Sequence, residues 1–336
     1  MFNFYNKIIA IIIIILFTTR INLSAQFNNN DAITIIQNSI VYDGALNYYV
    51  RDINSCTNNC TYSPYPGINV GPPDFSTIKN IVGADLGFMN ITSGLQTLQY
   101  QSNSIESGSF LNGKIVRCKS DLLSSDFKIL FMTQPRISPN WQLGGDLNNL
   151  VDWYNTGLRV FNIAWFEANE NHGVDEKLGY ATDANDNLGI SQLGINAISL
   201  MNNLGILVDV AHCNSQTTID AANMSSKPIL ASHTGVKAIN NISRNKSDSE
   251  IIAIANTGGI IGITPICWIL EYPTVDCDVV DLADHIVYVK NLVGIDHVSI
   301  ASDANMDGWE STSVHIPDPA ISGYMWYSTL ILVVSA

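Results

Sequence analysis

Short, nearly continuous apolar segments alternate with amphipathic segments over most of the chain after residue 126. The apolar segments cover residues 128–133, 158–165, 206–212, 228–233, 260–264 and 297–303. The amphipathic segments between them cover residues 148–155, 191–203, 215–224, 248–256 and 282–292. Strands that are apolar on both faces and are separated by helices are typical of a parallel sheet covered on both sides.

An earlier apolar segment and a weaker pattern bring the expected number of strands to seven or eight. The segment lies at residues 40–46, and the weaker pattern lies between residues 80 and 125. So many strand–helix units in one chain favour an α/β fold of the (β/α)8, TIM-barrel type. A doubly wound open sheet is the alternative, and it is disfavoured because no GxGxxG sequence follows the first strand.

The end of the chain does not fit a complete barrel. After Asp303 a barrel would need further helical and strand segments, but the sequence offers residues 316–319 and a final apolar run. We therefore expect a barrel that is incomplete at the C-terminus, or a chain that is truncated or frame-shifted. An incomplete barrel should leave an unpaired edge at its first strand, which residues 324–334 would cover.

The first 26 residues have the pattern of a secretory signal peptide. Lys7 precedes an apolar run at residues 8–17, and the small residues Ser24 and Ala25 follow. The run is short for a membrane span, although an uncleaved N-terminal anchor is the alternative. We predict an exported protein, periplasmic, extracellular or at the cell surface. Its barrel domain covers residues 27–336, with no transmembrane span after cleavage.

The composition indicates a folded, acidic protein. Apolar residues make up 46% of the chain, which excludes a disordered acidic chain. The 30 acidic and 16 basic residues give a net charge of −14, and no basic run interrupts them. Nucleic acid is therefore not an expected partner.

Export makes the six cysteines candidates for disulfides. Cys56 and Cys60 bracket a short polar loop, and Cys267 and Cys277 bracket a loop with Pro273. Either pair could close a small ring. The two remaining cysteines lie in periodic segments and are expected to be buried thiols: Cys118 and Cys213.

Polar side chains stand at the carboxyl ends of most predicted strands. They are Asn47, Gln134, Trp165, His212, His233 and Asp303. In a barrel these ends meet at the face that carries active sites. His212, His233 and Asp303 supply two imidazoles and a carboxylate, which are zinc ligands, and zinc acidifies a bound water. The alternative is that each is an ordinary polar residue with its hydrogen bonds satisfied.

Five linked motifs resemble the membrane (renal) dipeptidase family of zinc metallopeptidases. They follow the family order across about residues 126–308, where the resemblance is clearest. The motifs lie at residues 204–212, 227–233, 243–245, 257–263 and 294–303. The resemblance implies an amidohydrolase-type barrel that carries two zinc ions and cleaves dipeptides.

The resemblance also implies roles for individual residues. His212 and His233 would hold the second metal, and Asp303 would handle the proton of the attacking water. Arg244 would bind the terminal carboxylate of the substrate, a bidentate task that suits a guanidinium. A surface salt bridge is the alternative role for Arg244.

The chain departs from the family pattern at the other metal position. Ala45 and Asn47 stand where the family has a His-x-Asp pair, and Gln134 stands where it has a bridging Glu. Trp165 replaces a substrate-contacting His, so Trp165 and Asn47 are expected to lie against the substrate. The chain resembles divergent bacterial members of the family that have a similar Gln and lack the opening pair.

Two interpretations follow. The first is a dipeptidase-like hydrolase of dipeptides or small amides, with at most one Zn²⁺ on His212 and His233. Gln134, a weak neutral ligand, or water would complete the shell, and Asp303 would act as the general base. The second is a non-catalytic barrel that binds a peptide or a small amide, because a fold does not guarantee a function. A homodimer is left open.

Overall fold

The computed structural model describes most of the chain between residues 84 and 305, together with the first strand. The described residues are 41–47, 84–91, 94–133, 139–165, 177–182, 184, 187–272, 277, 279–301 and 303–305. The predicted signal peptide and the terminal run at residues 324–334 lie outside them.

Strands and helices alternate along the chain, and from β4 to β9 the longer ones lie close to the positions that the hydrophobic pattern predicts. The strands are β1 (Val41–Asn47), β2 (Ala84–Ile91), β3 (Gly113–Ile115), β4 (Phe127–Thr133), β5 (Leu158–Asn162), β6 (Leu207–Asp209), β7 (Leu230–Thr234), β8 (Ile260–Ile263), β9 (Val298–Ile300) and β10 (Ala304–Asn305). The helices are α4 (Leu95–Glu106), α5 (Pro139–Gln142), α6 (Asn149–Thr156), α7 (Gln192–Leu204), α8 (Ser215–Met224), α9 (Asp248–Asn256), α10 (Cys267–Leu270) and α11 (Val279–Val293), with short 3-10 turns η4 (Lys119–Leu123) and η6 (Ile295–His297).

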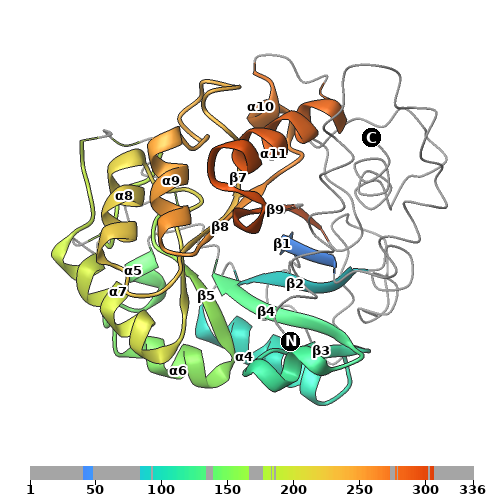
Figure 1. The fold of residues 1–336 in the computed structure, drawn as a ribbon. Helices are drawn as coiled ribbons and strands as arrows, with labels where there is room; N and C mark the ends of the chain where they lie inside the picture. The colour runs from blue at the N-terminus through green and yellow to red at the C-terminus, as the bar shows by residue number, and fades with distance from the viewer. Residues whose placement is uncertain are drawn as a thin grey trace, which may run out of the picture.

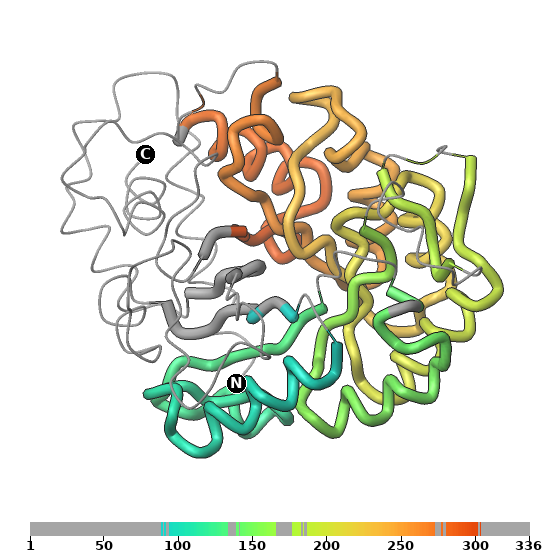
Figure 2. The backbone as a smooth tube through the Cα atoms, turned by 180° about the vertical axis from the view of Figure 1, so that it is seen from behind, coloured from blue at the N-terminus to red at the C-terminus, as the bar shows by residue number. Residues whose placement is uncertain are grey.

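The described strands form one parallel, curled sheet. Its order is β1-β2-β4-β5-β6-β7-β8-β9, and β3 adds to the amino-terminal part of β4. Figure 1 shows α7, α8 and α9 in a layer outside β5 to β8, and Figure 2 shows the same layer from behind. The expected TIM-type α/β fold is confirmed.

The sheet returns to its first strand. β10 follows β9 after a short bend and pairs in parallel with β1, at Leu46↔Ala304 and Asn47↔Asn305. The expectation of an unpaired edge along β1 is therefore wrong at its carboxyl end. β10, which follows β9 after the bend, is the partner of β1 that we expected to be missing.

Local sequence signals set the helix ends. The Ser191 hydroxyl accepts a hydrogen bond from the Gly194 backbone N–H at the start of α7. Gly205 ends that helix with φ 85°, a left-handed conformation that glycine adopts without steric cost. At the start of α9, Ser247 and Glu250 form a capping box. These caps fix where the chain leaves each helix for the next strand.

The predicted strand at residues 206–212 ends earlier in the structure, and a turn takes the place of its last residues. β6 ends at Asp209, so His212 lies in the turn that follows, whereas His233 lies within β7. The reason is chemical: the Asp209 carboxylate accepts the backbone N–H groups of Ala211 and Ser232. A side chain that takes these donors interrupts the strand ladder.

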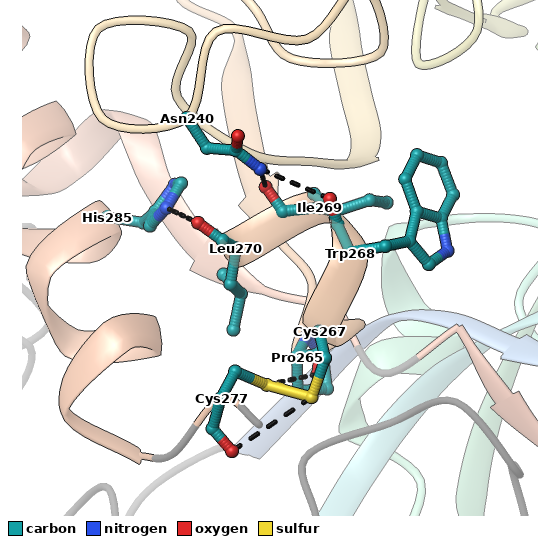
Figure 3. The surroundings of a disulfide bond; sticks show 8 residues. All are labelled: Asn240, Pro265, Cys267, Trp268, Ile269, Leu270, Cys277 and His285. Carbon is teal, nitrogen blue, oxygen red and sulfur yellow. Dashed lines mark hydrogen bonds between the residues drawn. A yellow bond between two sulfur atoms is a disulfide. The ribbon is translucent and has the colours of Figure 1, made fainter. Parts of the chain in front are cut away.

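The four cysteines in the described ranges form one disulfide, one buried thiol and one exposed thiol. Cys267 and Cys277 are joined, next to α10 (Figure 3). Cys213 is buried as predicted, but Cys118 is exposed, so that part of the prediction is wrong. Cys118 caps the turn η4, and its thiol lies 3.3 Å from Oδ2 of Asp121 instead of in the core. Cys56 and Cys60 lie outside the described residues.

None of the helices in the described ranges combines the length and the apolar character needed to cross a bilayer.

Candidate functional site

His212 and His233 meet at the carboxyl ends of β6 and β7. Their Nε2 atoms lie 3.0 Å apart, and the ring centroids are 5.0 Å apart at 64°. Both residues are almost fully buried, with 4% and 1% of their surface exposed. The proximity predicted from their strand-end positions is present, and their role as metal ligands stays a prediction.

The protonation of His233 can be deduced from its neighbours. The Ser232 hydroxyl donates to Oδ2 of Asp209 at 2.8 Å. Its oxygen lies 2.8 Å from Nδ1 of His233. Because a hydroxyl has one proton, Ser232 accepts the second hydrogen bond, and Nδ1 of His233 carries the hydrogen. Nε2 of His233 then presents a lone pair to His212.

Asp209 is a buried carboxylate with four hydrogen-bond donors around it. Oδ1 accepts from the backbone N–H groups of Ala211 at 3.1 Å and Ser232 at 2.8 Å. Oδ2 accepts from the Ser232 hydroxyl and from the Asn162 side-chain amide at 3.1 Å. Burial raises the pKa of Asp209, and these donors oppose that rise. The carboxylate thereby anchors both strand ends.

Both imidazoles are neutral near pH 7. Burial lowers the pKa of His212 well below its usual value, and the cations of Arg244 and Lys246 and the neighbouring His233 lower it further. Burial followed by Arg244 has the same effect on His233. Neutral imidazole is the form that binds a metal ion.

Asp303 lies beside the pair. Its Oδ2 is 3.8 Å from Nε2 of His233, and its side chain is 16% exposed. Its φ of 48° is left-handed, a conformation that Asp tolerates better than most residues. This bend between β9 and β10 brings the carboxylate to the imidazoles, as the sequence predicted.

Trp165 covers one side of the pair. Its ring lies 3.7 Å from the His212 ring, centroid to centroid, at an angle of 33°. The residue that the sequence predicted as a substrate contact therefore packs directly on one of the two imidazoles. An indole in this place keeps water from one face of His212.

Arg244 is buried beneath the histidines instead of lying on the surface. It is 4% exposed. Its Nη1 donates to the Ala211 carbonyl, and its Nη2 donates to the His233 carbonyl at 2.9 Å. Burial lowers the pKa of Arg244 to about 10, although Asp303 and Asp209 oppose that shift. The alternative of a surface salt bridge is therefore wrong.

Of the two remaining predicted residues, the structure describes the backbone of one, Asn47. Asn47 ends β1 and pairs with Asn305, so its backbone lies near the bend at Asp303. Gln134 lies outside the described residues. Within the described ranges, no group of three or more His, Cys, Asp or Glu side chains is arranged to hold a metal ion.

The residues present fit one zinc ion held by two imidazoles. Two nitrogens on a tetrahedral zinc lie roughly 3.3–3.4 Å apart, given bonds of about 2.0–2.1 Å. The observed 3.0 Å is within a small adjustment of that spacing. The bond from Nδ1 of His233 to Ser232 is the outer contact that metal-binding histidines usually make.

Sequence reasoning missed Asp209 and Ser232 as supports for the site. The signal was present: Asp209 is a charged residue inside an otherwise apolar strand, and Ser232 immediately precedes His233. A carboxylate at a buried strand position must find several donors, and here those donors are the neighbours of the two histidines.

Comparison with known proteins extends these observations. The model of the membrane dipeptidase family (peptidase family M19) matches residues 113–319. The dipeptidase tcpJ of Claviceps purpurea is 29% identical over 170 residues, which are 51% of this chain and 38% of the fungal protein. An uncharacterized protein in the pqqA 5′ region of Klebsiella pneumoniae is 28% identical over 193 residues, 56% of this chain and 68% of that protein. The match thus spans well under two thirds of the fungal relative.

Solved structures show the same fold. The probable dipeptidase PvdM from Pseudomonas aeruginosa superposes with a TM-score of 0.69 at 18% identity, covering 90% of this chain and 92% of that one. A metallo peptidase from Rhodobacter sphaeroides, solved with a phosphinate mimic of the dipeptide L-Ala-D-Ala, gives 0.62 at 18% identity, covering 87% and 98%. At such identities the likeness concerns the fold alone. Because the family model covers more than half of the chain, the protein belongs to the membrane dipeptidase family, M19.

Proposed function

We propose that the protein is a metal-dependent hydrolase of dipeptides or related small amides, with a single zinc ion on His212 and His233. The meeting of the two Nε2 atoms at 3.0 Å, between neutral and buried rings, carries this proposal. Membership of a dipeptidase family supports the reaction class and a peptide substrate. Gln134 or water would complete the zinc shell.

The other residues of the site have complementary tasks in this proposal. Asp303 takes the proton of the attacking water, because its carboxylate is beside the imidazoles and reaches solvent. Arg244 binds the substrate carboxylate with those of its five N–H donors that do not bond the main chain. Trp165 and Asn47 border the substrate.

When bound, zinc supplies an acidified water and an electrophile for the amide carbonyl. The side chains around the site keep water out and hold the ligands in place. Trp165 excludes water from His212, and the Asp209–Ser232 contact orients His233.

A non-catalytic barrel is the second candidate function. Ala45 and Asn47 favour it, because they stand where the family pattern has a His and an Asp. A pocket without those ligands would bind a peptide or a small amide without cleaving it.

The substitution Asp303→Asn tests the catalytic proposal. It should leave the zinc content unchanged and lower the rate of dipeptide hydrolysis by about 10²–10⁴, the usual contribution of a general base. Zinc is measured by elemental analysis after reconstitution, and hydrolysis is measured by amine release. The control Asp146→Asn alters an exposed carboxylate whose Oδ1 accepts from the backbone and side-chain N–H groups of Asn148, and it should change neither quantity.

A wild-type protein that binds zinc and cleaves no dipeptide favours the non-catalytic barrel. Two tightly held zinc ions in the wild-type protein would contradict the single-ion proposal.

Export is part of the proposal as well. The N-terminal pattern of residues 1–26 and the disulfide between Cys267 and Cys277 support it, because disulfides persist in oxidising compartments. Cell fractionation with sequencing of the mature N-terminus tests it. A mature protein that begins at Met1 in the cytosol would contradict it. The homodimer stays a prediction.

A further inference from the structure

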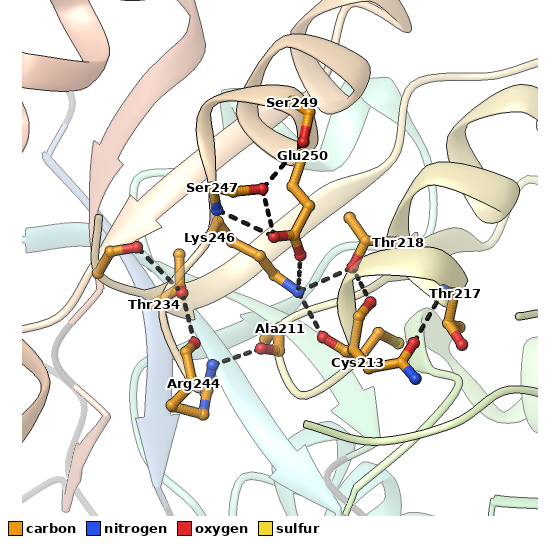
Figure 4. Close-up of polar contacts among 12 residues, drawn as sticks. Ala211, Cys213, Thr217, Thr218, Thr234, Arg244, Lys246, Ser247, Ser249 and Glu250 are labelled. Atoms are coloured by element: carbon orange, nitrogen blue, oxygen red, sulfur yellow. Dashed lines mark hydrogen bonds and ion pairs between the residues drawn. The ribbon is translucent and has the colours of Figure 1, made fainter. Parts of the chain in front are cut away.

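Two cations of one short segment hold the main chain on both sides of His212. Arg244 donates to the carbonyl oxygen of Ala211. Lys246 donates to the carbonyl oxygen of Cys213 at 2.6 Å. Figure 4 shows both contacts reaching the turn after β6. The carbonyl groups of the residues before and after His212 are thus both bonded to residues 244–246.

The carbonyl of His212 itself has a different partner. The backbone N–H of Thr182 donates to it at 2.9 Å. Three consecutive carbonyls therefore have partners from outside the turn, although β6 has already ended at Asp209. A histidine in such a turn has no strand ladder to hold it, so these three contacts set its backbone.

Lys246 is itself held in one position. Its side chain is 1% exposed, and its ammonium bonds Thr218 Oγ1 at 2.8 Å and Glu250 Oε1 at 3.2 Å besides Cys213. An ammonium has three donors, and these three partners use all of them. The direction of the bond to Cys213 is therefore fixed.

Glu250 is the anion that keeps Lys246 in place. Its Oε2 accepts from the backbone N–H of Ser247 at 2.9 Å and from the Ser247 hydroxyl at 2.7 Å. Burial alone raises the pKa of Glu250, but Lys246 and Ser247 outweigh it and leave that pKa below its usual value. Glu250 is therefore an anion at neutral pH, rigidly attached to the start of α9.

We propose that Lys246 is a positioning residue for His212, fixing the carbonyl group of the next residue, Cys213, so that Nε2 of His212 points at His233. A buried ion pair is weak evidence for stability, because apolar residues of similar volume often serve as well. The contact with Cys213 gives this pair a task that an apolar pair would not perform. The consequence for metal binding rests on the proposed function, whereas the consequence for the His212 ring does not.

The test uses a variant without the ion pair's charges. Lys246→Met alone leaves Glu250 buried without its cation and is expected to fold poorly. The double variant Lys246→Met/Glu250→Gln removes both charges and keeps the contact with Ser247. Zinc affinity is measured by competition with a chromophoric chelator, and the histidine rings of the metal-free protein are observed by ¹⁵N NMR.

The double variant should melt within a few degrees of the wild-type protein and bind zinc about 10- to 100-fold more weakly, the usual effect of losing an outer contact to a metal ligand. Its His212 ring signals should shift, whereas those of His297 should not. Ile251→Ala is the matched control, because it weakens the buried face of the same helix without a polar contact to the turn. It should lower the melting temperature and leave the affinity and the His212 signals unchanged.

A double variant with wild-type zinc affinity and unmoved His212 signals would overturn the inference. If the wild-type protein binds no zinc, the proposed function fails, and the NMR comparison of the metal-free proteins still decides the role of Lys246.

Discussion

The β6–β7 side and the β1 side of the barrel mouth differ in the residues that the sequence places there. At β6 and β7, two imidazoles and their supporting charges are buried and hydrogen-bonded to one another. At β1, Ala45 and Asn47 stand where the family pattern has a His and an Asp. Burying polar groups costs free energy unless each finds a partner. The polar groups on the β6–β7 side have such partners and are held in one arrangement. We therefore expect the chemistry of the protein to take place on that side.

The largest expected effect comes from removing either imidazole. His212→Ala or His233→Ala should abolish stoichiometric zinc binding, because one remaining strong ligand does not compete with hydration. Zinc content after dialysis, measured by elemental analysis, should fall from about one per chain to near zero under the single-site proposal.

His297→Ala is the matched control for these variants. His297 bonds the Gly259 carbonyl through Nδ1 at 2.8 Å, at the start of β9 and away from the pair. Its loss should leave the zinc content unchanged. Zinc retained by both His212→Ala and His233→Ala would show that the β6–β7 side is not the metal site.

The next effect tests the β1 side directly. The triple substitution Ala45→His, Asn47→Asp and Gln134→Glu restores the family pattern and should raise the zinc content from one towards two per chain. The reason is that a His and two carboxylates are strong zinc ligands, whereas a methyl group and amides are not. Unchanged zinc content in a folded triple variant would mean that the β1 side lacks the geometry as well as the ligands.

Much of the fold could be predicted from the sequence because the strands are nearly continuous apolar segments, whereas the helices between them are amphipathic. The segments predicted at residues 215–224 and 248–256 coincide with α8 and α9. The closure at β1 was missed. It depends on two residue pairs after the bend at Asp303, and no local pattern marks so short a strand as β10.

The site was predictable in part. His212, His233 and Asp303 could be found because they lie at or just after the carboxyl ends of apolar segments, and parallel strands end on one face. Their supports could not be found in this way. Lys246 lies in a polar segment that resembles any solvated loop, and only the folded chain shows its ammonium under the turn after β6. Arg244 was recognised, but its bonds to two carbonyls depend on the same packing.

A smaller effect should follow from weakening the support of His233. Asp209→Asn replaces an acceptor with an amide that opposes the Asn162 amide, leaving a buried donor unsatisfied. We expect a loss of about 1–3 kcal/mol in the free energy of unfolding, measured by urea denaturation. Ser232 should then accept from the new amide and turn its own proton towards Nδ1 of His233, which moves the ring hydrogen to Nε2. Nε2 then has no lone pair for a metal ion, and zinc affinity should fall about 10- to 100-fold.

Asp220→Asn is the matched control for Asp209→Asn. Its carboxylate accepts from the Ile190 backbone and from Gln216 on the outer helix layer. It should lower stability without changing zinc affinity or the ¹⁵N signals of His233. Equal effects of both variants on zinc affinity would mean that Asp209 affects the site only through general stability and has no specific role in supporting His233.

The smallest effect concerns another histidine, His285, which joins the backbone at Val236, just after β7, to the end of α10. Its Nδ1 accepts from the Val236 backbone N–H at 2.8 Å, and its Nε2 lies 3.1 Å from the Leu270 carbonyl (Figure 3). Nδ1 is thus an acceptor and Nε2 a donor, which is the neutral form. Burial lowers the pKa of His285, against the opposing influence of Leu270, Asp281 and Asp284.

The sign of the pH dependence follows from that direction. The unfolded chain has the ordinary histidine pKa of about 6.5 and binds a proton before the folded chain does. The contribution of His285 to stability is therefore complete above that value and is lost as the pH falls below it. His285→Gln keeps an acceptor for Val236 and does not titrate. Between pH 7 and pH 5 its free energy of unfolding should fall less steeply than that of the wild-type protein, by at most about 1.4 kcal/mol per pH unit. His212 and His233 titrate in both proteins, so the difference between the two urea-denaturation series isolates His285. Identical slopes would mean that protonation of His285 does not destabilise the folded chain, and that the link between Val236 and α10 does not depend on its neutral form.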